Sequence, residues 1–183
     1  MLIGLTGYAQ SGKDTLAQEL VDNYGFTRVA FADKIRELAY DTNPIVKPGL
    51  KLQDAVEEMG WEKAKTRIPE VRSILQNLGV GGRKIFGEYF WIEQALRNIP
   101  SKYPHGARIV VTDVRFINEA DWIKKYENSH IWRVKRPNVG AVNSHVSESE
   151  MDGYKADQIF NNTGTVEDLK RLVKIRMGLV NDL

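Results

Sequence analysis

Residues 7–15 combine two glycines with a lysine in a spacing that suits one chemical task. Glycines let the backbone curl until successive N–H groups face one anion, and a helix that begins at the loop adds its partial positive charge. A lysine directly after the second glycine can reach the terminal phosphates of the same ligand. The spacing G-x-x-x-x-G-K therefore predicts a loop for a nucleoside triphosphate. The residues expected at the triphosphate are Gly7, Ala9, Gln10, Ser11, Gly12, Lys13, Asp14 and Thr15.

Two carboxylates stand where a metal ion could accompany these phosphates. Asp14 takes the position at which Ser or Thr usually offers a hydroxyl to Mg²⁺, and a hydroxyl follows at Thr15. Asp113 ends an apolar run at the carboxyl end of an expected strand, where open parallel sheets bind ligands. Carboxylate oxygens are competent Mg²⁺ ligands, so we expect Asp14 and Asp113 to hold the ion. Two alternatives stay open: Asp14 only favours the helix N-terminus, and Asp113 only caps a turn.

The neighbouring segments have the patterns needed to hold such a loop. Leu2–Thr6 is a short apolar run typical of a buried strand, and apolar residues at helical spacing follow the loop up to Gly25. Further strands are expected over 27–31, 108–113, 130–135 and 157–161, and helices over 118–126 and from 165 onward. Strands that alternate with helices predict a P-loop NTPase fold of three α/β/α layers, with a parallel sheet of about five strands.

The stretch between the second and third expected strands is helical in pattern. It holds three expected helices between Leu50 and Ile99, with a break at the glycines around position 80. We therefore expect 1–183 to form a single domain in which approximately 34–100 make a helical substrate-binding insert. Apolar periodicity disappears between 136 and 153, which indicates a lid.

The composition excludes several other classes of protein. The 183 residues are 42% hydrophobic and 27% charged, as in one globular domain, so a disordered or collagen-like chain is excluded. The absence of cysteine excludes disulfides, thiolate metal sites and a cysteine nucleophile. A net charge of +2 does not indicate a nucleic-acid polymer as partner, and no apolar run is long enough for a membrane span. We expect a cytoplasmic protein.

The phosphate loop, with Asp directly after its lysine, is similar to that of the bacteriophage deoxynucleoside monophosphate kinases. Three further motifs resemble the same family in the right order. They are the helix motif Arg72-Ser-Ile-Leu-Gln-Asn-Leu-Gly79 with the later Arg83 and Trp91, the signature Asp113-Val-Arg-Phe-Ile-Asn-Glu119, and the strand-to-helix turn Asn161-Asn-Thr-Gly-Thr165. Together these motifs span most of the chain.

The resemblance implies transfer of the γ-phosphoryl group of ATP to a deoxynucleoside monophosphate, with Mg²⁺ accompanying ATP. Both substrates are polyanions and the acceptor is already an ionised phosphate, so cations are needed more than a general base. The residues that the resemblance places at the acceptor are Lys34, Arg72, Gln76, Arg115 and Trp132. Those placed at adenine, through loop backbone, are Asn162, Gly164 and Val166. The residues expected to act in catalysis are Lys13, Asp14, Arg83, Arg115 and Arg136.

Several alternatives remain at this point. Another small-molecule P-loop kinase, of the phosphomevalonate or dephospho-coenzyme A type, shares parts of the loop chemistry, and a non-catalytic ATP-binding module needs only the loop. Trp132 is equally well explained as a core residue, and Arg83 and Arg136 as surface charges. The accepted bases and the formation of a homodimer stay open.

Overall fold

The computed structural model describes residues 1–97, 106–141 and 149–181, and the side chains of residues 179–181 are not among the described ones. The chain divides into two compact units. Unit 1 comprises Met1–Ala30 and Asn98–Leu183, and unit 2 comprises Phe31–Arg97. Unit 2 falls on the stretch that the sequence sets apart as an insert.

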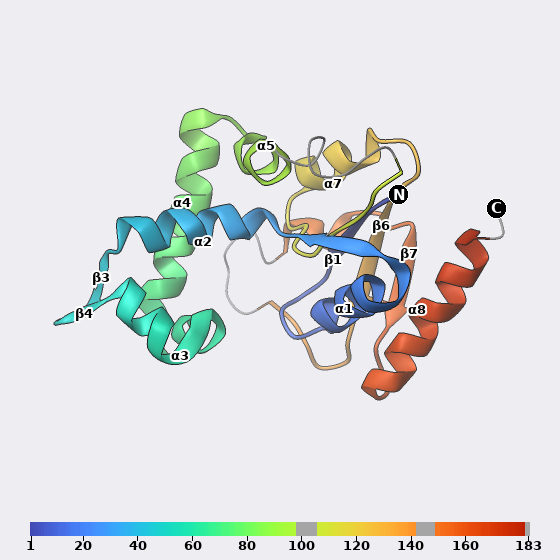
Figure 1. Ribbon diagram of the computed structural model, residues 1–183, viewed down its shortest axis with the longest axis horizontal. Helices are drawn as coiled ribbons and strands as arrows, with labels where there is room; N and C mark the ends of the chain where they lie inside the picture. The colour runs from blue at the N-terminus through green and yellow to red at the C-terminus, as the bar shows by residue number, and fades with distance from the viewer. Residues whose placement is uncertain (98–105, 142–148, 182–183) are drawn as a thin grey trace. The chain divides into compact units, whose positions relative to one another are not determined.

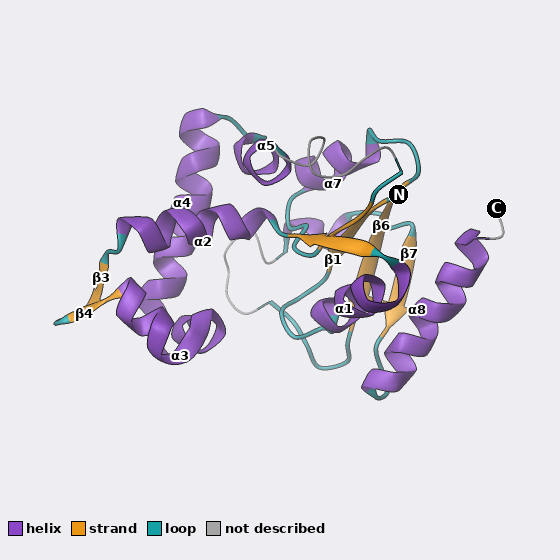
Figure 2. Ribbon diagram, viewed as in Figure 1, coloured by secondary structure: helices purple, strands orange, loops and turns teal. Residues whose placement is uncertain are grey.

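Unit 1 is built on a five-stranded sheet with the order β2-β5-β1-β6-β7, and every neighbouring pair is parallel (Figures 1 and 2). The strands are β1 (Leu2–Thr6), β2 (Phe26–Val29), β5 (Arg108–Val111), β6 (Ser129–Lys135) and β7 (Gln158–Asn161). The strands expected from the sequence are therefore confirmed, with no boundary shifted by more than two residues.

Helices cover both faces of this sheet (Figure 2). They are α1 (Lys13–Tyr24), α7 (Ile117–Lys124) and α8 (Val166–Asn181), with a short 3₁₀ helix η2 (Glu150–Gly153) before β7. The helices α1 and α8 share one apolar core with the side chains of β1, β6 and β7 that point to their face. The three-layer α/β/α arrangement of a P-loop fold is thus confirmed.

Strand β1 shows how the alternation of side chains sets the two faces. Ile3 and Leu5 are fully buried in the core beneath α1 and α8. Gly4 points to the opposite face, where an added Cβ would come within 2.8 Å of the Ile123 Cδ1 atom of α7. The missing side chain therefore lets α7 pack directly on the central strand.

Unit 2 is helical apart from one hairpin. Its elements are α2 (Phe31–Thr42), the hairpin β3 (Ile45–Lys47) and β4 (Leu50–Lys51), α3 (Leu52–Arg67), α4 (Pro69–Phe86) and α5 (Phe90–Leu96). Its core gathers small and branched apolar residues from α2, β3, α3 and α4, among them Ala39, Val46, Leu52 and Val71. The hairpin was not expected from the sequence.

Helix α4 corrects one expectation. The break predicted at Gly79, Gly81 and Gly82 does not occur, and the helix runs through these glycines to Phe86. Gly82 is needed for packing, because a Cβ there would lie 2.7 Å from the indole of Trp91. The Trp91 Nε1–H donates to the Gly79 carbonyl oxygen at 2.9 Å. Gly79 and Gly82 therefore seat α5 on α4, and none of the three glycines ends the helix.

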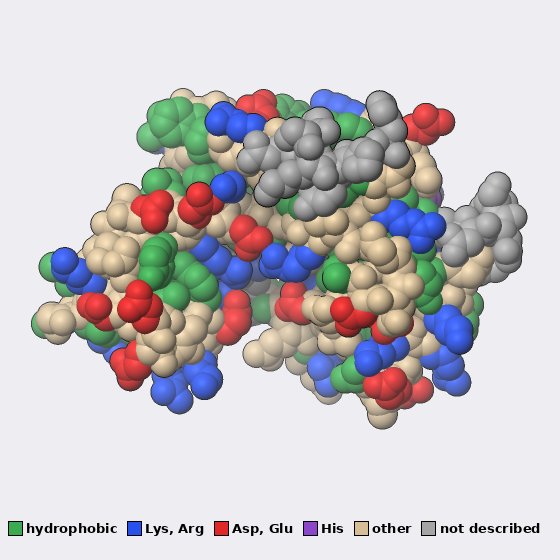
Figure 3. Space-filling view, in the orientation of Figure 1, with side chains coloured by type: hydrophobic (Ala, Val, Ile, Leu, Met, Phe, Trp, Pro, Cys, Tyr) green, Lys and Arg blue, Asp and Glu red, His purple; other side chains and the backbone are tan. Residues whose placement is uncertain are grey.

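Charge is mixed on the visible surface. Lys and Arg side chains alternate with Asp and Glu side chains on the face shown in Figure 3, in keeping with a net charge of +2. Among the described helices, none combines the length and the apolar character needed to cross a lipid bilayer.

Candidate active site

The site of unit 1 forms where neighbouring strands lead to helices on opposite faces. The chain leaves β1 toward α1, and it leaves the adjacent strand β5 toward α7. Open parallel sheets bind ligands outside the carboxyl ends of the strands at such a point. The phosphate loop follows β1 there, and Asp113 follows β5.

The phosphate loop depends on two glycines with positive φ. Gly7 has φ 134°, and an added Cβ would lie 2.3 Å from the Val134 carbonyl oxygen of β6. Gly12 has φ 108° and precedes the first helical residue, Lys13. The N-cap residue Gly12 makes no side-chain capping hydrogen bond, and the N–H groups of a helix's first turn suit an anion. The geometry expected for a phosphate loop is present.

The Lys13 ammonium lies inside the loop. Its Nζ donates to the carbonyl oxygens of Gly7 at 2.6 Å and Tyr8 at 2.7 Å. This holds the cation over the loop that the sequence assigned to phosphates. Ala9 is half-buried, Gln10 is exposed with φ 63°, and Thr15 is half-buried in the first turn of α1.

The cavity beside this loop is basic. It has a volume of about 440 Å³ and lies at the carboxyl ends of β1 and β6. Its lining consists of Thr6, Gly7, Tyr8, Val114, Arg115, Arg133, Val134, Lys135, Arg136, Val139, Met151 and Asp152. Arg115 and Arg136, both expected at the site from the sequence, line this cavity. Arg133 and Lys135 also line it but were not predicted. Four cationic residues and one carboxylate at a phosphate loop suit a polyanionic ligand.

Hydrogen bonds fix the segment around η2 along one side of the cavity. The Arg133 guanidinium donates to the carbonyl oxygens of Met151, Asp152 and Tyr154 in and after η2. The Tyr8 hydroxyl donates to Asp152 Oδ2 at 2.7 Å, and this hydrogen bond raises the pKa of Tyr8. Of the segment 136–153, expected as a lid, residues 142–148 lie outside the described part. Its described end is docked on β6 and on the phosphate loop.

The structure explains the last residue of the Asp113–Glu119 signature. The buried Glu119 carboxylate accepts from the N–H groups of Arg115 at 2.8 Å and Phe116 at 3.1 Å. The loop after β5 is thereby fixed, with Arg115 lining the cavity. This capping role of Glu119 was not predicted, although a carboxylate at the start of a helix is a signal for such capping.

The two expected metal ligands lie at the same edge of the sheet. Asp14 is exposed in the first turn of α1, and Asp113 is half-buried two residues after the end of β5. The Val114 N–H donates to the Leu5 carbonyl oxygen at 3.0 Å, so the chain around Asp113 runs beside the end of β1. Both positions offer hard carboxylate oxygens next to the phosphate loop, and this donor set fits Mg²⁺.

Trp132 requires a correction. It pairs in register with Leu5 and lies on the same side of the sheet, beneath α1 and α8. Its side chain is fully buried, with its ring 5.1 Å from the ring of Phe160. No face of the indole is open to a base, so Trp132 is a core residue and not an acceptor contact.

The turn after β7 supports the phosphate loop. Asn162 is buried, its N–H donates to the Lys135 carbonyl oxygen at 2.7 Å, and its side-chain Nδ2 donates to the Ser11 carbonyl oxygen at 2.9 Å. Thr165 and Asp168 exchange hydrogen bonds that cap α8. The backbone N–H of Asn162, a residue expected to hold adenine through loop backbone, and one N–H of its side-chain amide are thus occupied within the protein.

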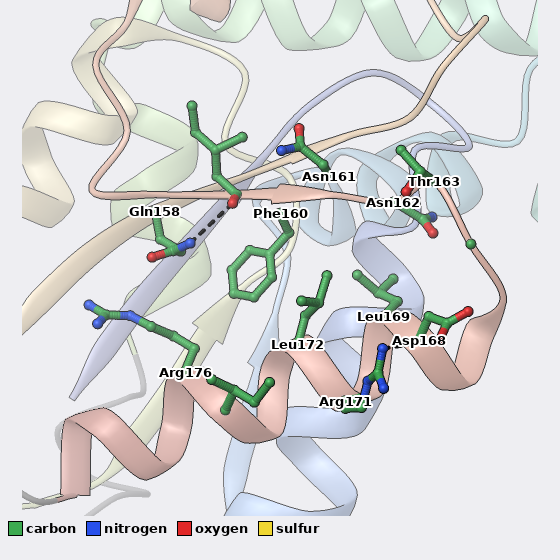
Figure 4. A pocket seen from close by; sticks show the side chains of 13 residues that line it. Gln158, Phe160, Asn161, Asn162, Thr163, Asp168, Leu169, Arg171, Leu172 and Arg176 are labelled. Carbon is green, nitrogen blue, oxygen red and sulfur yellow. Dashed lines mark hydrogen bonds and ion pairs between the residues drawn. The ribbon is translucent and has the colours of Figure 1, made fainter.

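The other two positions expected at adenine are at the surface. Gly164 is exposed next to the Asp168 carboxylate, and Val166, the first residue of α8, is 54% exposed. A second cavity of about 490 Å³ lies between β7 and α8, and its lining includes Asn162, Gly164, Leu172 and Arg176 (Figure 4).

The remaining expected residues are in unit 2. Arg72, Gln76 and Arg83 lie on α4 at intervals of four and seven residues. Because eleven residues make about three helical turns, all three share one face of a helix that the predicted break would have divided. Lys34 lies on α2 and forms an ion pair with Glu37.

Unit 2 also contains a basic cluster that the sequence analysis missed. The Glu62 carboxylate of α3 contacts Lys65 at 2.7 Å and Arg36 of α2 at 3.3 Å. Burial lowers the pKa of Lys65, and the charges of Arg36 and Arg72 lower it further. Three cations around one carboxylate repel one another, and a bound dianion would relieve that repulsion. No short motif could have revealed this cluster, because the packing of three helices assembles it.

Comparisons with known proteins agree on one family. The family model described as deoxynucleotide monophosphate kinase matches residues 51–173. A protein of Acanthamoeba polyphaga mimivirus, named as a deoxynucleotide monophosphate kinase, is 31% identical over 180 residues, which cover 92% of this chain and 91% of that protein.

Two solved structures are similar in outline. The crystal structure of TT1252 from Thermus thermophilus is 18% identical, with a TM-score of 0.49 over 97% of this chain and 96% of that one. Shikimate kinase from Aquifex aeolicus is 14% identical, with a TM-score of 0.46 over 100% of this chain and 98% of that one. Neither similarity bears on the substrate.

The family match covers more than half of the chain, and the viral relative aligns with nearly all of it. Both agree with what the phosphate loop and the basic cavity can do, which is to bind and transfer phosphate groups. The chain is therefore a phosphotransferase and belongs to the deoxynucleotide monophosphate kinase family.

Proposed function

We propose that this protein transfers the γ-phosphoryl group of ATP to a deoxynucleoside monophosphate and releases ADP and the deoxynucleoside diphosphate. The observation that carries the proposal is the basic cavity of about 440 Å³ that joins the phosphate loop with Arg115 and Arg136. A cavity of this size and charge suits phosphate groups, and the family supplies the class of acceptor.

The residues have separable tasks in this reaction. The N–H groups at the start of α1 and the Lys13 ammonium hold the triphosphate, while Arg115 and Arg136 stabilise the negative charge of the group in transfer. In unit 2, Arg72, with Arg36 and Lys65 beside the Glu62 carboxylate, binds the acceptor phosphate. Lys34, Gln76 and Arg83 are the further candidates for acceptor and phosphoryl contacts. The acceptor phosphate is ionised, so no general base is assigned.

Asp14 and Asp113 would hold Mg²⁺ together with phosphate oxygens of ATP. This division is expected because Mg²⁺ usually takes only one or two carboxylates from a protein, together with substrate phosphates. When bound, the ion supplies charge neutralisation at the β- and γ-phosphates.

A coupled assay for ADP release tests this function. The four deoxynucleoside monophosphates, the ribonucleotides, phosphomevalonate and dephospho-coenzyme A are offered as acceptors with Mg²⁺ and ATP. ADP release that depends on at least one deoxynucleoside monophosphate supports the proposal. Turnover of only phosphomevalonate or dephospho-coenzyme A would assign another kinase reaction, and ATP binding without acceptor-dependent ADP would indicate a binding module.

A further inference from the structure

The turn after β7 reaches back to the phosphate loop across most of the sequence. The hydrogen bond from Asn162 Nδ2 to the Ser11 carbonyl oxygen, 2.9 Å long, joins residues 151 positions apart. Asn162 is 8% exposed and Ser11 is 1% exposed. Water does not compete well for a hydrogen bond that is buried in this way, so the contact fixes the orientation of the Ser11 carbonyl group.

The orientation of this carbonyl group also sets a donor of the phosphate loop. The Ser11 carbonyl and the Gly12 N–H belong to one planar trans peptide, in which the two groups point in opposite directions. When Asn162 holds the carbonyl oxygen, the Gly12 N–H must point away from the turn after β7. A rotated peptide would exchange the two groups and present a carbonyl oxygen where the loop needs a donor.

Such a rotation is a real possibility for this peptide. Gly12 has φ 108°, and glycine crosses between positive and negative φ at little cost. An added Cβ at Gly12 would lie 2.6 Å from Asn162 Nδ2, so the amide is seated directly against this residue. Asn162 itself is anchored, because its N–H donates to the Lys135 carbonyl oxygen of β6 at 2.7 Å. The central sheet thus supplies the rigidity that the glycine lacks.

We propose that Asn162 is a positioning residue of the phosphate loop. Its amide holds the Ser11–Gly12 peptide with the Gly12 N–H turned toward the phosphates of the nucleotide. This role rests on the proposed binding of ATP at the loop, and it replaces a contact between Asn162 and adenine. The residue acts on every ligand that carries the phosphate chain, whether or not a base is attached.

Calorimetric titration with two ligands, ATP and inorganic tripolyphosphate, tests the role, both with Mg²⁺ and without acceptor. Asn162→Ala removes the donor, and Asn162→Asp replaces it with a carboxylate of the same shape that repels the carbonyl oxygen. The matched control is Asn161→Asp, because Asn161 is the exposed neighbour and its side chain points to the other side of the strand end (Figure 4). We expect both Asn162 variants to bind ATP and tripolyphosphate more weakly by the same factor, roughly tenfold or more, and the control to bind both within twofold of wild type.

Two results would overturn the proposal. A loss for ATP with unchanged tripolyphosphate binding would place Asn162 at the base, and unchanged binding of both ligands would leave it no part in the loop. Melting curves show whether the variants fold. If neither variant folds, Asn162→Ser is titrated with the same two ligands, because its hydroxyl keeps a donor of shorter reach. The same two results would overturn the proposal. Since no acceptor is present, a failure to phosphorylate any deoxynucleoside monophosphate would refute the proposed reaction without deciding this comparison.

Discussion

Replacing Gly7 by alanine should displace the phosphate loop by a distance that the structure defines. This displacement should disable the loop. The new Cβ would lie 2.3 Å from the Val134 carbonyl oxygen, which is backbone of the central sheet and cannot move aside. Ordinary contact needs roughly 1 Å more, so the loop must move by about that amount. The φ of 134° adds strain of about 1–3 kcal/mol for any residue with a side chain.

A displacement of this size in a reacting geometry lowers turnover by roughly 10²-fold. Steady-state ADP release with varied ATP and with varied acceptor measures the effect, which we expect in kcat and in the KM for ATP, with little change in the KM for the acceptor. The matched control is Gly25→Ala. Gly25 also has a left-handed φ, 68°, but its added Cβ meets nothing within 4 Å. The control should lose about 1 kcal/mol of stability, seen as a melting shift of about 2–4 °C, and keep its activity. Activity of Gly7→Ala within threefold of the control would refute the reasoning.

Three further changes have defined outcomes. Lys13→Ala should lower turnover by roughly 10²- to 10³-fold in the same assay while the melting temperature changes little, because this cation stabilises charge that is largest in the transition state; Lys170→Ala, which removes an exposed lysine of α8, is its control. Arg72→Ala should raise the KM for the acceptor roughly tenfold or more and leave the KM for ATP unchanged, because it removes a charged partner of one substrate only. Asp157→Asn should destabilise the protein by about 1 kcal/mol or less at pH 7, measured by thermal melting, because it breaks the 3.0 Å ion pair with Lys124.

The pH dependence of the last variant follows from the sign of the pKa shift. Hydrogen bonds from the Ile131 N–H and Lys124 hold the pKa of Asp157 below its ordinary value of 3.8, although burial opposes them. Its stabilising effect is therefore complete above the ordinary pKa and is lost as the pH falls through the lowered one. Wild type and Asp157→Asn should melt together in that acid range, and a difference that persists there would contradict the assignment. For the other two variants, full turnover of Lys13→Ala would contradict the role of Lys13. An unchanged KM of Arg72→Ala for the acceptor would contradict the role of Arg72.

The phosphate loop could be predicted because its signals are consecutive in the chain. An apolar strand, two glycines, a lysine and an amphipathic helix follow one another within the first 25 residues, and each is local chemistry. The parallel sheet follows from the same kind of local pattern. The hairpin at Ile45–Lys51 was not predicted, although Pro48-Gly49 is a turn signal, because its strands of three and two residues are too short to show an alternating pattern.

The errors concern relations between distant residues. Whether Trp132 faces a ligand or the core depends on its register with Leu5 in β1, which no local pattern shows. The glycines near position 80 resemble a helix break until the indole of Trp91 is seen to occupy the space beside Gly82. The grouping of Arg36 and Lys65 around Glu62 exists only after α2 and α3 have packed together.

The most direct test of the central claim is to follow the phosphoryl group itself. ATP labelled at the γ-phosphate is incubated with the protein, Mg²⁺ and each deoxynucleoside monophosphate, and the products are separated and counted. We expect the label to appear at the β-position of a deoxynucleoside diphosphate, with one ADP formed for each label transferred, and to stay in ATP when Lys13→Ala is used. Label released only as inorganic phosphate, or retained in ATP with every deoxynucleoside monophosphate, would contradict the proposed reaction.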